Sequence, residues 1–379
     1  MADMPLKVLH FGDVFLDCPF SGLSAAQSQE RRRETRNTFL RAVKYAQEQE
    51  MGLVLITGNL VDHNYATLDT LKLLVDAFAS APKCQFVICP GPHDPMTEDS
   101  IYRLGTFPEN VTIFDSVEPS VKRFDTSGVS VVGWAFGDRT YAGSPLAGTR
   151  PTTEAGDLVI VAGYATDGGM DGTAPTSVTQ IGAFGGDYAA LSGGNLFDGF
   201  HRVNTTTYAY SGALEHASYE EPGFGGANLI TLNQVMGVVR AETARVDFGC
   251  RRYALEQFDV TGVTGPSEVL NKITEVIRER GYGKETALKV ILVGYTPMGF
   301  AIPKSLTADT FGLYVFELED RTLPAFDEST VARDMTVKGE VCRTLLPKMR
   351  GGTDAEQQGA AYALRVALGA LEGKDISQL

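Results

Sequence analysis

The chain has 379 residues, which at about 150 residues per domain is too long for one modest domain. Hydrophobic residues make up 43% and charged residues 21%, which excludes a chain that is disordered throughout. The 33 Lys and Arg against 47 Asp and Glu give a net charge of −14. Any contact with nucleic acid would therefore need a local basic patch that acts against the overall field.

Cysteine usage and the N-terminus bear on the cellular compartment. The five cysteines are scattered and form no C-x-x-C pair, which argues against a disulfide framework and against a zinc ribbon. The N-terminus lacks a basic region followed by an apolar stretch, and no apolar run reaches about 18 residues. We therefore expect a cytoplasmic protein without a membrane segment.

The first part of the chain alternates short apolar runs with helical periodicity, which is typical of successive β-α units. We predict strands at 6–11, 53–57 and 86–89, and helices at 27–48 and 68–78. Each strand leads directly into a polar loop. Because ligands collect at the carboxyl ends of strands in open α/β sheets, these loops are the first place to look for a site.

The middle of the chain reads as a series of strands without long helices between them. The expected strands are 129–134, 158–162, 188–191, 207–210, 228–232 and 237–240. We therefore predict a first domain over residues 1–250.

The pattern changes after Cys250. A strand at 253–259, a helix that opens at Pro266 and a strand at 288–293 predict a small α/β capping domain over residues 251–330. Residues 331–379 are predicted to be a helical C-terminal tail. Its two helices, 337–346 and 355–371, are expected to be separated by Pro347 and the glycines that follow.

Polar side chains gather just after the first three strands: Asp13, Asn59, Asp62, His93 and Asp94. Such residues at strand ends are able to assemble a metal or phosphate site. The alternative is that Asp and Asn occur there because they form Asx-turns and helix N-caps. The residue types alone leave both interpretations open.

The order of these loops resembles the calcineurin-like metallophosphoesterases, and among them the bacterial DNA-repair exonucleases of the SbcD type. The family segments Asp-x-His, Gly-Asp-x-x-Asp and Gly-Asn-His-Asp correspond to Asp13-Val14-Phe15, Gly58-Asn59-Leu60-Val61-Asp62 and Gly91-Pro92-His93-Asp94. Residues 187–195 and 210–215 resemble two later family segments, so the likeness covers about residues 5–240. It implies an α/β sandwich that holds two Mn²⁺ or other divalent ions and hydrolyses phosphodiesters.

The departures from the family pattern fall on the metal ligands that the resemblance implies. Asp13 matches the first ligand. Phe15 stands where the family has its first His, and Asn59 stands where it has the bridging Asp. Pro92 replaces the family's Asn, and Gly193 and Asn195 replace its final two His. The strand at 158–162 also ends without the family's isolated His. Asp13 alone is retained in kind, so we expect no bound metal cofactor.

Two further groups of residues have both a functional and a purely structural interpretation. His93 and Asp94 match the third family segment, where the His acts on the leaving group and the Asp orients it, but both also occur as ordinary hydrogen-bonded loop residues. Residues 31–33 and Arg36 form an arginine cluster that either faces a phosphate or pairs with neighbouring Glu30 and Glu34.

We carry two functional hypotheses. The first is a degenerate relative of the DNA-repair exonucleases that serves as a non-catalytic binding or scaffold subunit. The second is an active metal-dependent phosphodiesterase or DNA exonuclease with a rebuilt site. The resemblance implies that the tail docks an SMC-like ATPase through the apolar stripes of its helices, whereas both helices could instead pack on the capping domain. Whether DNA is bound is left open.

Overall fold

The computed structural model describes residues 5–20, 23–167, 173–193, 196–297, 300, 306–325 and 333–371. The chain divides into two compact units. The first comprises residues 1–217 and 224–250, and the second comprises residues 218–223 and 251–379.

The first sheet of the first unit is built from β-α units. Strands β1 (Leu6–Phe11), β2 (Leu53–Ile56), β3 (Gln85–Ile88) and β4 (Val111–Ile113) pair in parallel and in this order. Strand β11 (Gly223–Val235) pairs antiparallel with β1, and β12 (Val238–Asp259) lies beside β11. Helix α1 (Ala25–Glu48) connects β1 to β2, helix α2 (Leu68–Ala79) connects β2 to β3, and the short α3 (Ile101–Leu104) precedes β4.

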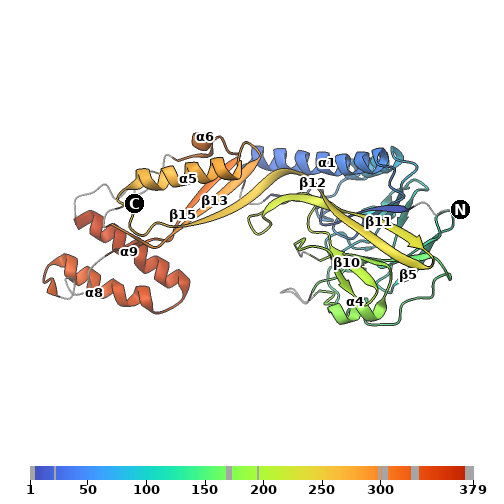
Figure 1. Ribbon diagram of the computed structural model, residues 1–379. Coiled ribbons are helices and arrows are strands. Elements are labelled where there is room, and N and C mark those ends of the chain that lie inside the picture. Colours follow the sequence, from blue (N-terminus) through green and yellow to red (C-terminus); the bar gives the residue numbers. More distant parts are fainter. Residues whose placement is uncertain are drawn as a thin grey trace. The chain divides into compact units, whose positions relative to one another are not determined.

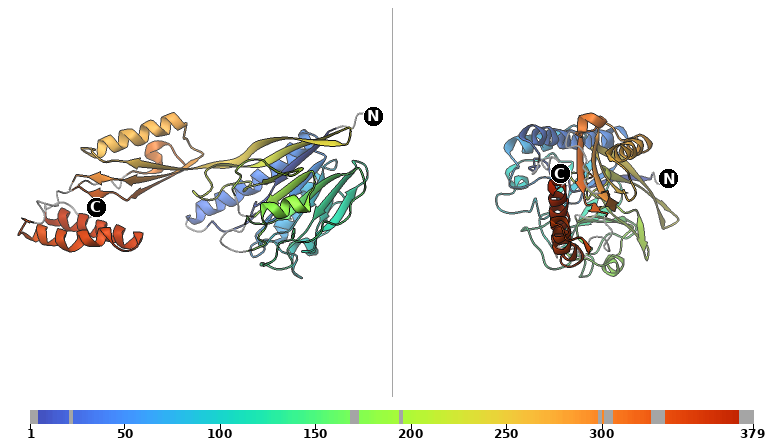
Figure 2. Two further views of the ribbon diagram at one scale, coloured as in Figure 1. Left: turned by 60° about the horizontal axis from the view of Figure 1, so that its bottom comes forward. Right: turned by 90° about the vertical axis from the view of Figure 1, so that its left-hand side faces the viewer.

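The second sheet of this unit contains β5 (Ser120–Phe124), β6 (Val129–Gly133), β7 (Leu158–Tyr164), β8 (Tyr188–Ser192), β10 (Thr206–Tyr210) and β9 (His201–Val203), in that spatial order. Its four central strands are parallel, and β5 and β9 are antiparallel at the two edges. Helix α4 (Val178–Phe184) packs on this sheet (Figure 2).

The alternation of side chains along the strands creates the layers. Val54 and Ile56 face the cluster that contains residues of α1 and α2, whereas Leu53 and Leu55 face the second sheet. A third cluster, which includes Ile181 of α4, covers the other face of the second sheet. The predicted α/β fold with two packed sheets is therefore confirmed. Its strands read as continuous apolar runs because both of their faces are buried.

The sequence pattern missed several elements. Strands β5 and β9 are short edge strands with exposed side chains, so they lack an apolar run. Strand β12 is 22 residues long, whereas we predicted two separate strands at 237–240 and 253–259. The intervening residues are mostly charged or half-exposed, and hydrophobic alternation therefore could not detect them.

The second unit contains a parallel three-stranded arrangement and a covering helix. The end of β12 pairs with β13 (Thr286–Val293), which pairs with β15 (Val315–Asp320). Helix α5 (Pro266–Arg280) lies along these strands (Figure 1) and begins with Pro266, which lacks the N–H that a first helical turn leaves unpaired. The remaining short elements are β14 (Tyr295–Thr296), α6 (Ala308–Phe311) and β16 (Leu323–Pro324).

Two helices end the described chain, α8 (Val337–Arg350) and α9 (Asp354–Leu371), and they lie side by side in both views (Figures 1 and 2). The prediction that Pro347 would end the first helix is wrong, because α8 continues through it to Arg350. Pro347 lies in the last turn of α8, where it lacks the N–H that would bond the carbonyl four residues earlier. Cys342, Leu364 and Leu368 are buried between the helices, whereas Ala363 of α9 is exposed.

A buried polar cluster lies in the first unit around His10 of β1. Its Nδ1 lies 2.8 Å from the Tyr188 hydroxyl and its Nε2 lies 3.0 Å from the Thr57 hydroxyl. The Asn228 amide nitrogen also approaches Nδ1, so Nδ1 is the acceptor and Nε2 carries the proton. Burial, aided by the positive charge of Arg245, lowers the pKa of His10 to about 3. His10 is therefore neutral in the folded protein at neutral pH.

This pKa makes stability depend on pH. As the pH falls below about 6.5, the unfolded chain gains a proton at His10, whereas the folded chain does so only near pH 3. We expect protonation of His10 in the unfolded chain to lower the free energy of unfolding by up to about 5 kcal/mol across this range. The full loss is reached near pH 3. Denaturant unfolding at pH 7, 5.5 and 4 should show a flatter pH profile for His10→Gln than for the wild type. Parallel profiles for the two proteins would contradict a neutral His10.

Candidate functional site

The loops that carry the candidate residues meet at the carboxyl ends of the parallel strands of both sheets. A Cβ on Gly58, after β2, would lie 3.1 Å from the Tyr164 ring at the end of β7. Ser192, at the end of β8, donates a hydrogen bond to the Thr57 carbonyl. The ends of β1, β2, β7 and β8 are therefore in direct contact. The fold brings together the positions that the family resemblance singled out.

The Asn59 side chain is fixed by two hydrogen bonds of opposite polarity. Its Oδ1 accepts a bond from the backbone N–H of His93 at 2.9 Å, and its Nδ2 donates to Oδ1 of Asp13 at 2.6 Å. Because a backbone N–H can only donate, Oδ1 of Asn59 must face His93. Nδ2 must then face the Asp13 carboxylate. The amide thus joins the first and third loops directly.

The Asp94 carboxylate is directed at the backbone of the same loops. It accepts hydrogen bonds from the backbone N–H of Asn59, Leu60 and Gly91 and from the Tyr102 hydroxyl, at 2.7 to 3.0 Å. Burial raises the pKa of Asp94, and these four bonds act in the opposite direction. The geometry gives Asp94 a role in fixing the loops of β2 and β3.

His93 and Phe15 form the accessible part of the site. Their rings are in edge-to-face contact, with centroids 5.1 Å apart, so Phe15 packs against His93 where the family has two metal-binding loops. His93 is exposed and its imidazole makes no hydrogen bond among the described residues. The catalytic assignment of His93 and Asp94 stays a prediction.

Two positions at the ends of the second sheet have no room for a side chain. A Cβ on Gly193 would lie 2.1 Å from the carbonyl oxygen of Ala165, and one on Gly163 would lie 2.3 Å from the Trp134 indole. That indole is buried and donates from Nε1 to the Tyr164 carbonyl at 2.9 Å. Neighbouring backbone and an aromatic ring therefore fill the space where ligand side chains were expected.

The remaining polar and ligand positions in these loops are buried or hydrogen-bonded within the protein wherever the structure describes them. Pro92 is buried in the loop after β3, and Asn195 lies outside the described residues. Asp62 accepts a bond from the backbone N–H of Asn64, as an Asx-turn residue does. Asp17 pairs with Arg36 and with Thr70.

The arginine cluster does not present a set of unpaired cations. Arg31 is buried and pairs with Glu34 and with Glu215, and Arg36 pairs with Asp17 and Asp69. Two of the four guanidinium groups are thus committed to ion pairs within the first unit. The predicted pairing with Glu34 is found for Arg31, whereas Arg36 pairs with carboxylates outside the cluster.

The backbone of these loops is strained. Asp13, Phe15 and Asn59 have φ angles of 47°, 51° and 48°, in the left-handed region that residues with a Cβ seldom adopt. Each costs on the order of 1 kcal/mol or more, and such residues cluster at functional sites. Hydrogen bonds from Asp13 and Phe15 to the backbone of Gly58 and Asn59 hold the conformation.

Sequence reasoning did not find Tyr102, Trp134 or Tyr164 as parts of this site. All three are buried aromatic residues that contact the loops from the side. In the sequence they have the appearance of ordinary core residues. Only the folded chain shows that they fill or brace the loops.

The fold and the site define a class of protein. Two stacked sheets, with polar loops at the ends of parallel strands, form a metallophosphoesterase-like α/β sandwich. Residues 6–189 match the model of the calcineurin-like phosphoesterase family. This part of the chain is similar to that family, as the loop motifs implied.

Comparison with solved structures finds similar folds at low sequence identity. The protein TT1561 of Thermus thermophilus covers 64% of this chain and 99% of its own, with 12% identity and a TM-score of 0.37. Double- and single-mutant forms of Vps29 from Entamoeba histolytica each cover 64% of this chain and 100% of their own, with 12% identity and a TM-score of 0.27. No curated protein sequence matches the chain.

The described part of the chain lacks two features. No group of three or more His, Cys, Asp or Glu residues is placed to hold a metal ion within it. None of the helices described has the length and apolar character required to cross a lipid bilayer. All five cysteines, which are described, are free thiols.

The packing at Gly193 and Gly163 leads to a stability prediction. Alanine at either position forces a Cβ into backbone or into the Trp134 ring, so we expect a loss of about 1–3 kcal/mol or more in the free energy of unfolding. Gly137→Ala is the matched control, because its Cβ would meet nothing within 4 Å. Urea denaturation of the three variants measures the difference. A tolerated Gly193→Ala would mean that the space is open to a ligand side chain.

Proposed function

We propose that this protein is a degenerate relative of the bacterial DNA-repair exonucleases, cytoplasmic and non-catalytic, which serves as a binding or scaffold subunit. The observation that carries the proposal is the hydrogen bond between the Asn59 amide and the Asp13 carboxylate. Two metal ions in this family need a carboxylate between them, because an amide supplies no negative charge. Here the amide nitrogen, which is a donor, faces the one retained ligand.

The surrounding residues support the same conclusion. Phe15, Pro92 and Gly193 offer no metal-binding side-chain atom, and the space at Gly193 is filled by the backbone of Ala165. The oxygen of the Asn59 amide is already engaged by His93. The residues present therefore do not fit a two-metal centre, and we derive no hydrolytic step through one.

Metal content and hydrolysis distinguish this proposal from an active phosphodiesterase. We expect the purified protein to hold less than stoichiometric Mn²⁺, Fe²⁺ or Zn²⁺, and to leave bis(p-nitrophenyl) phosphate and duplex DNA ends intact with added Mn²⁺. Elemental analysis and a colorimetric assay measure both. A bound transition metal that Asp13→Ala removes, or a rate that His93→Ala removes, would favour the active phosphodiesterase.

A substitution at Asn59 tests the hydrogen bond itself. Asn59→Asp places a second carboxylate against Asp13 and removes the donor, so we expect a loss of about 1–3 kcal/mol at pH 7. Asn37→Asp, on the exposed face of α1, is the control. Melting is followed with and without Mn²⁺. Mn²⁺ that stabilises Asn59→Asp but not the wild type would agree with the loss of the bridging carboxylate. Asn59→Asp that is as stable as the wild type at pH 7 without Mn²⁺ would contradict the role given to this hydrogen bond.

The scaffold role concerns the C-terminal helices, and we propose an SMC-like ATPase as the partner. The side chains buried in the helix pair all belong to α8 and α9, whereas Val337 and Tyr362 are 66% and 56% exposed. Exposed apolar side chains on this helix pair are available to a partner helix.

Deletion of residues 331–379 tests this role. Because the helix pair buries its own core, we expect the truncated protein to melt cooperatively near the temperature of the full chain. It should fail to retain the ATPase in a pull-down that the full chain supports. A truncated chain that aggregates or melts far earlier would assign the helices to the protein's own fold instead.

A further inference from the structure

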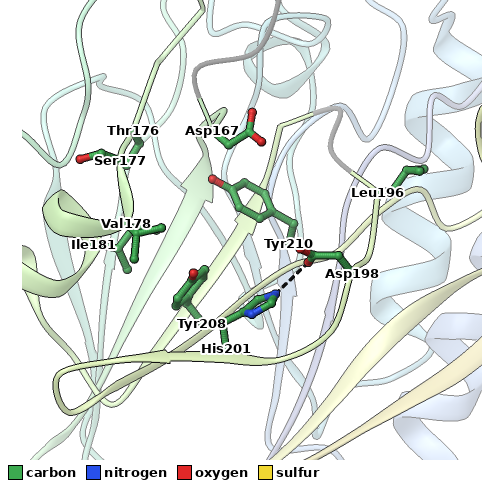
Figure 3. Close-up of a pocket in the computed structure, with 10 residues that line it drawn as sticks. All are labelled: Asp167, Thr176, Ser177, Val178, Ile181, Leu196, Asp198, His201, Tyr208 and Tyr210. Carbon is green, nitrogen blue, oxygen red and sulfur yellow. Dashed lines mark hydrogen bonds and ion pairs between the residues drawn. The ribbon is translucent and has the colours of Figure 1, made fainter.

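A cavity of about 510 Å³ opens on the second sheet of the first unit, between α4 and the loop that precedes β9 (Figure 3). Its size falls within the range of about 300–1,000 Å³ that is usual for small-molecule sites. Tyr208 and Tyr210 of β10 and Ile181 of α4 form part of its lining. None of the described metal-ligand positions implied by the family resemblance lines it, although Tyr210 begins the segment 210–215 that resembles the family.

Two tyrosines give the cavity polar groups without a partner among the described residues. Tyr208 and Tyr210 are only 8% and 7% exposed. Both line the cavity, and Figure 3 draws them with the other lining residues. Neither hydroxyl hydrogen-bonds to any described residue. Both hydroxyls face the open cavity, where a ligand can reach them and replace water as their hydrogen-bond partner.

The charge on the cavity is negative. Asp167 and Asp198 are exposed carboxylates on its lining, and none of the described residues that line it is a Lys or Arg. His201 lies 3.0 Å from Asp198 and packs against the Tyr208 ring. Burial and the two carboxylates raise the pKa of Tyr210, and burial with Asp198 raises the pKa of Tyr208, so both hydroxyls stay protonated.

The other hydroxyls on the lining are already committed within the protein. Thr176 is bonded to Ser144 and to the Ala174 carbonyl, and Ser177 caps α4 through Gln180. The groups left for a ligand are therefore the Asp167 carboxylate, the second oxygen of Asp198 beside His201, two phenol oxygens and the aromatic faces. Carboxylates and aromatic faces attract cations, and hydroxyl oxygens accept from N–H donors.

We propose that this cavity binds an organic cation, an alkylammonium or guanidinium group whose charge meets Asp167 and Asp198 and whose alkyl stem lies against Tyr208, Tyr210 and Ile181. An anion would be repelled by the two carboxylates. A purely apolar molecule would leave both tyrosine hydroxyls without partners, at a cost in affinity. The cation is either a free small amine or the side chain of a Lys or Arg in a partner protein.

Calorimetric titration of the full chain tests the proposal with matched probes. We expect n-butylammonium to bind, n-butanol of the same shape to bind at least about tenfold more weakly, and the affinity to fall as salt is raised. Acetyl-Gly-Lys-Gly-amide distinguishes the sources. Tighter binding of the peptide than of butylammonium assigns the site to a protein side chain, and the reverse assigns it to a free amine.

Variants locate the binding. Asp167→Asn and Asp198→Asn should each weaken butylammonium binding by about tenfold, whereas Asp115→Asn, an exposed carboxylate that does not line the cavity, should leave it unchanged. Tyr210→Phe keeps the ring but removes the hydroxyl, and its affinity for butylammonium should fall severalfold. Unchanged melting curves show that each variant folds. Three results would overturn the proposal. Butanol could bind as tightly as butylammonium, or the three Asn variants could bind butylammonium equally well. The third is that neither cation binds at 50 mM, about the weakest affinity of interest.

Discussion

The hydrogen bond from the Asn59 amide to the Asp13 carboxylate is the interaction on which the rest of the site depends. It joins the loop after β1 to the loop after β2, and the bond from the His93 backbone to the same amide adds the loop after β3. In a two-metal phosphoesterase, ions would hold these loops together through their ligands. Here one neutral side chain makes the connection, and its orientation is fixed by the donor on one side and the acceptor on the other.

The strain in the loops follows from this connection. Asp13, Phe15 and Asn59 adopt left-handed backbone angles, and such residues persist only where the surrounding structure holds them. Asp94 supplies part of that support, because its buried carboxylate binds three backbone N–H groups and the Tyr102 hydroxyl. The left-handed backbone angles of these loops are thus held by hydrogen bonds within and between the loops.

The sequence predicted the layered core well, because Val54, Ile56 and their neighbours form apolar runs that only a doubly covered strand shows. It also placed Asp13, Asn59 and His93 together, since parallel strands end at one edge. It did not predict that Trp134 and the Ala165 carbonyl fill the space at Gly163 and Gly193, because close packing between distant segments leaves no local pattern. The tyrosine-lined cavity was missed for the same reason: Tyr208 and Tyr210 alternate like ordinary strand residues.

The central claim is that a direct amide-to-carboxylate bond stands where this family places metal ions. Crystals of the full chain grown in excess Mn²⁺ and measured at the manganese absorption edge test it most directly. The account predicts no anomalous peak beside Asp13, with the Asn59 amide nitrogen still at hydrogen-bond distance from its carboxylate. An anomalous peak within coordinating distance of Asp13, with the Asn59 amide turned so that its oxygen faces the ion, would contradict it.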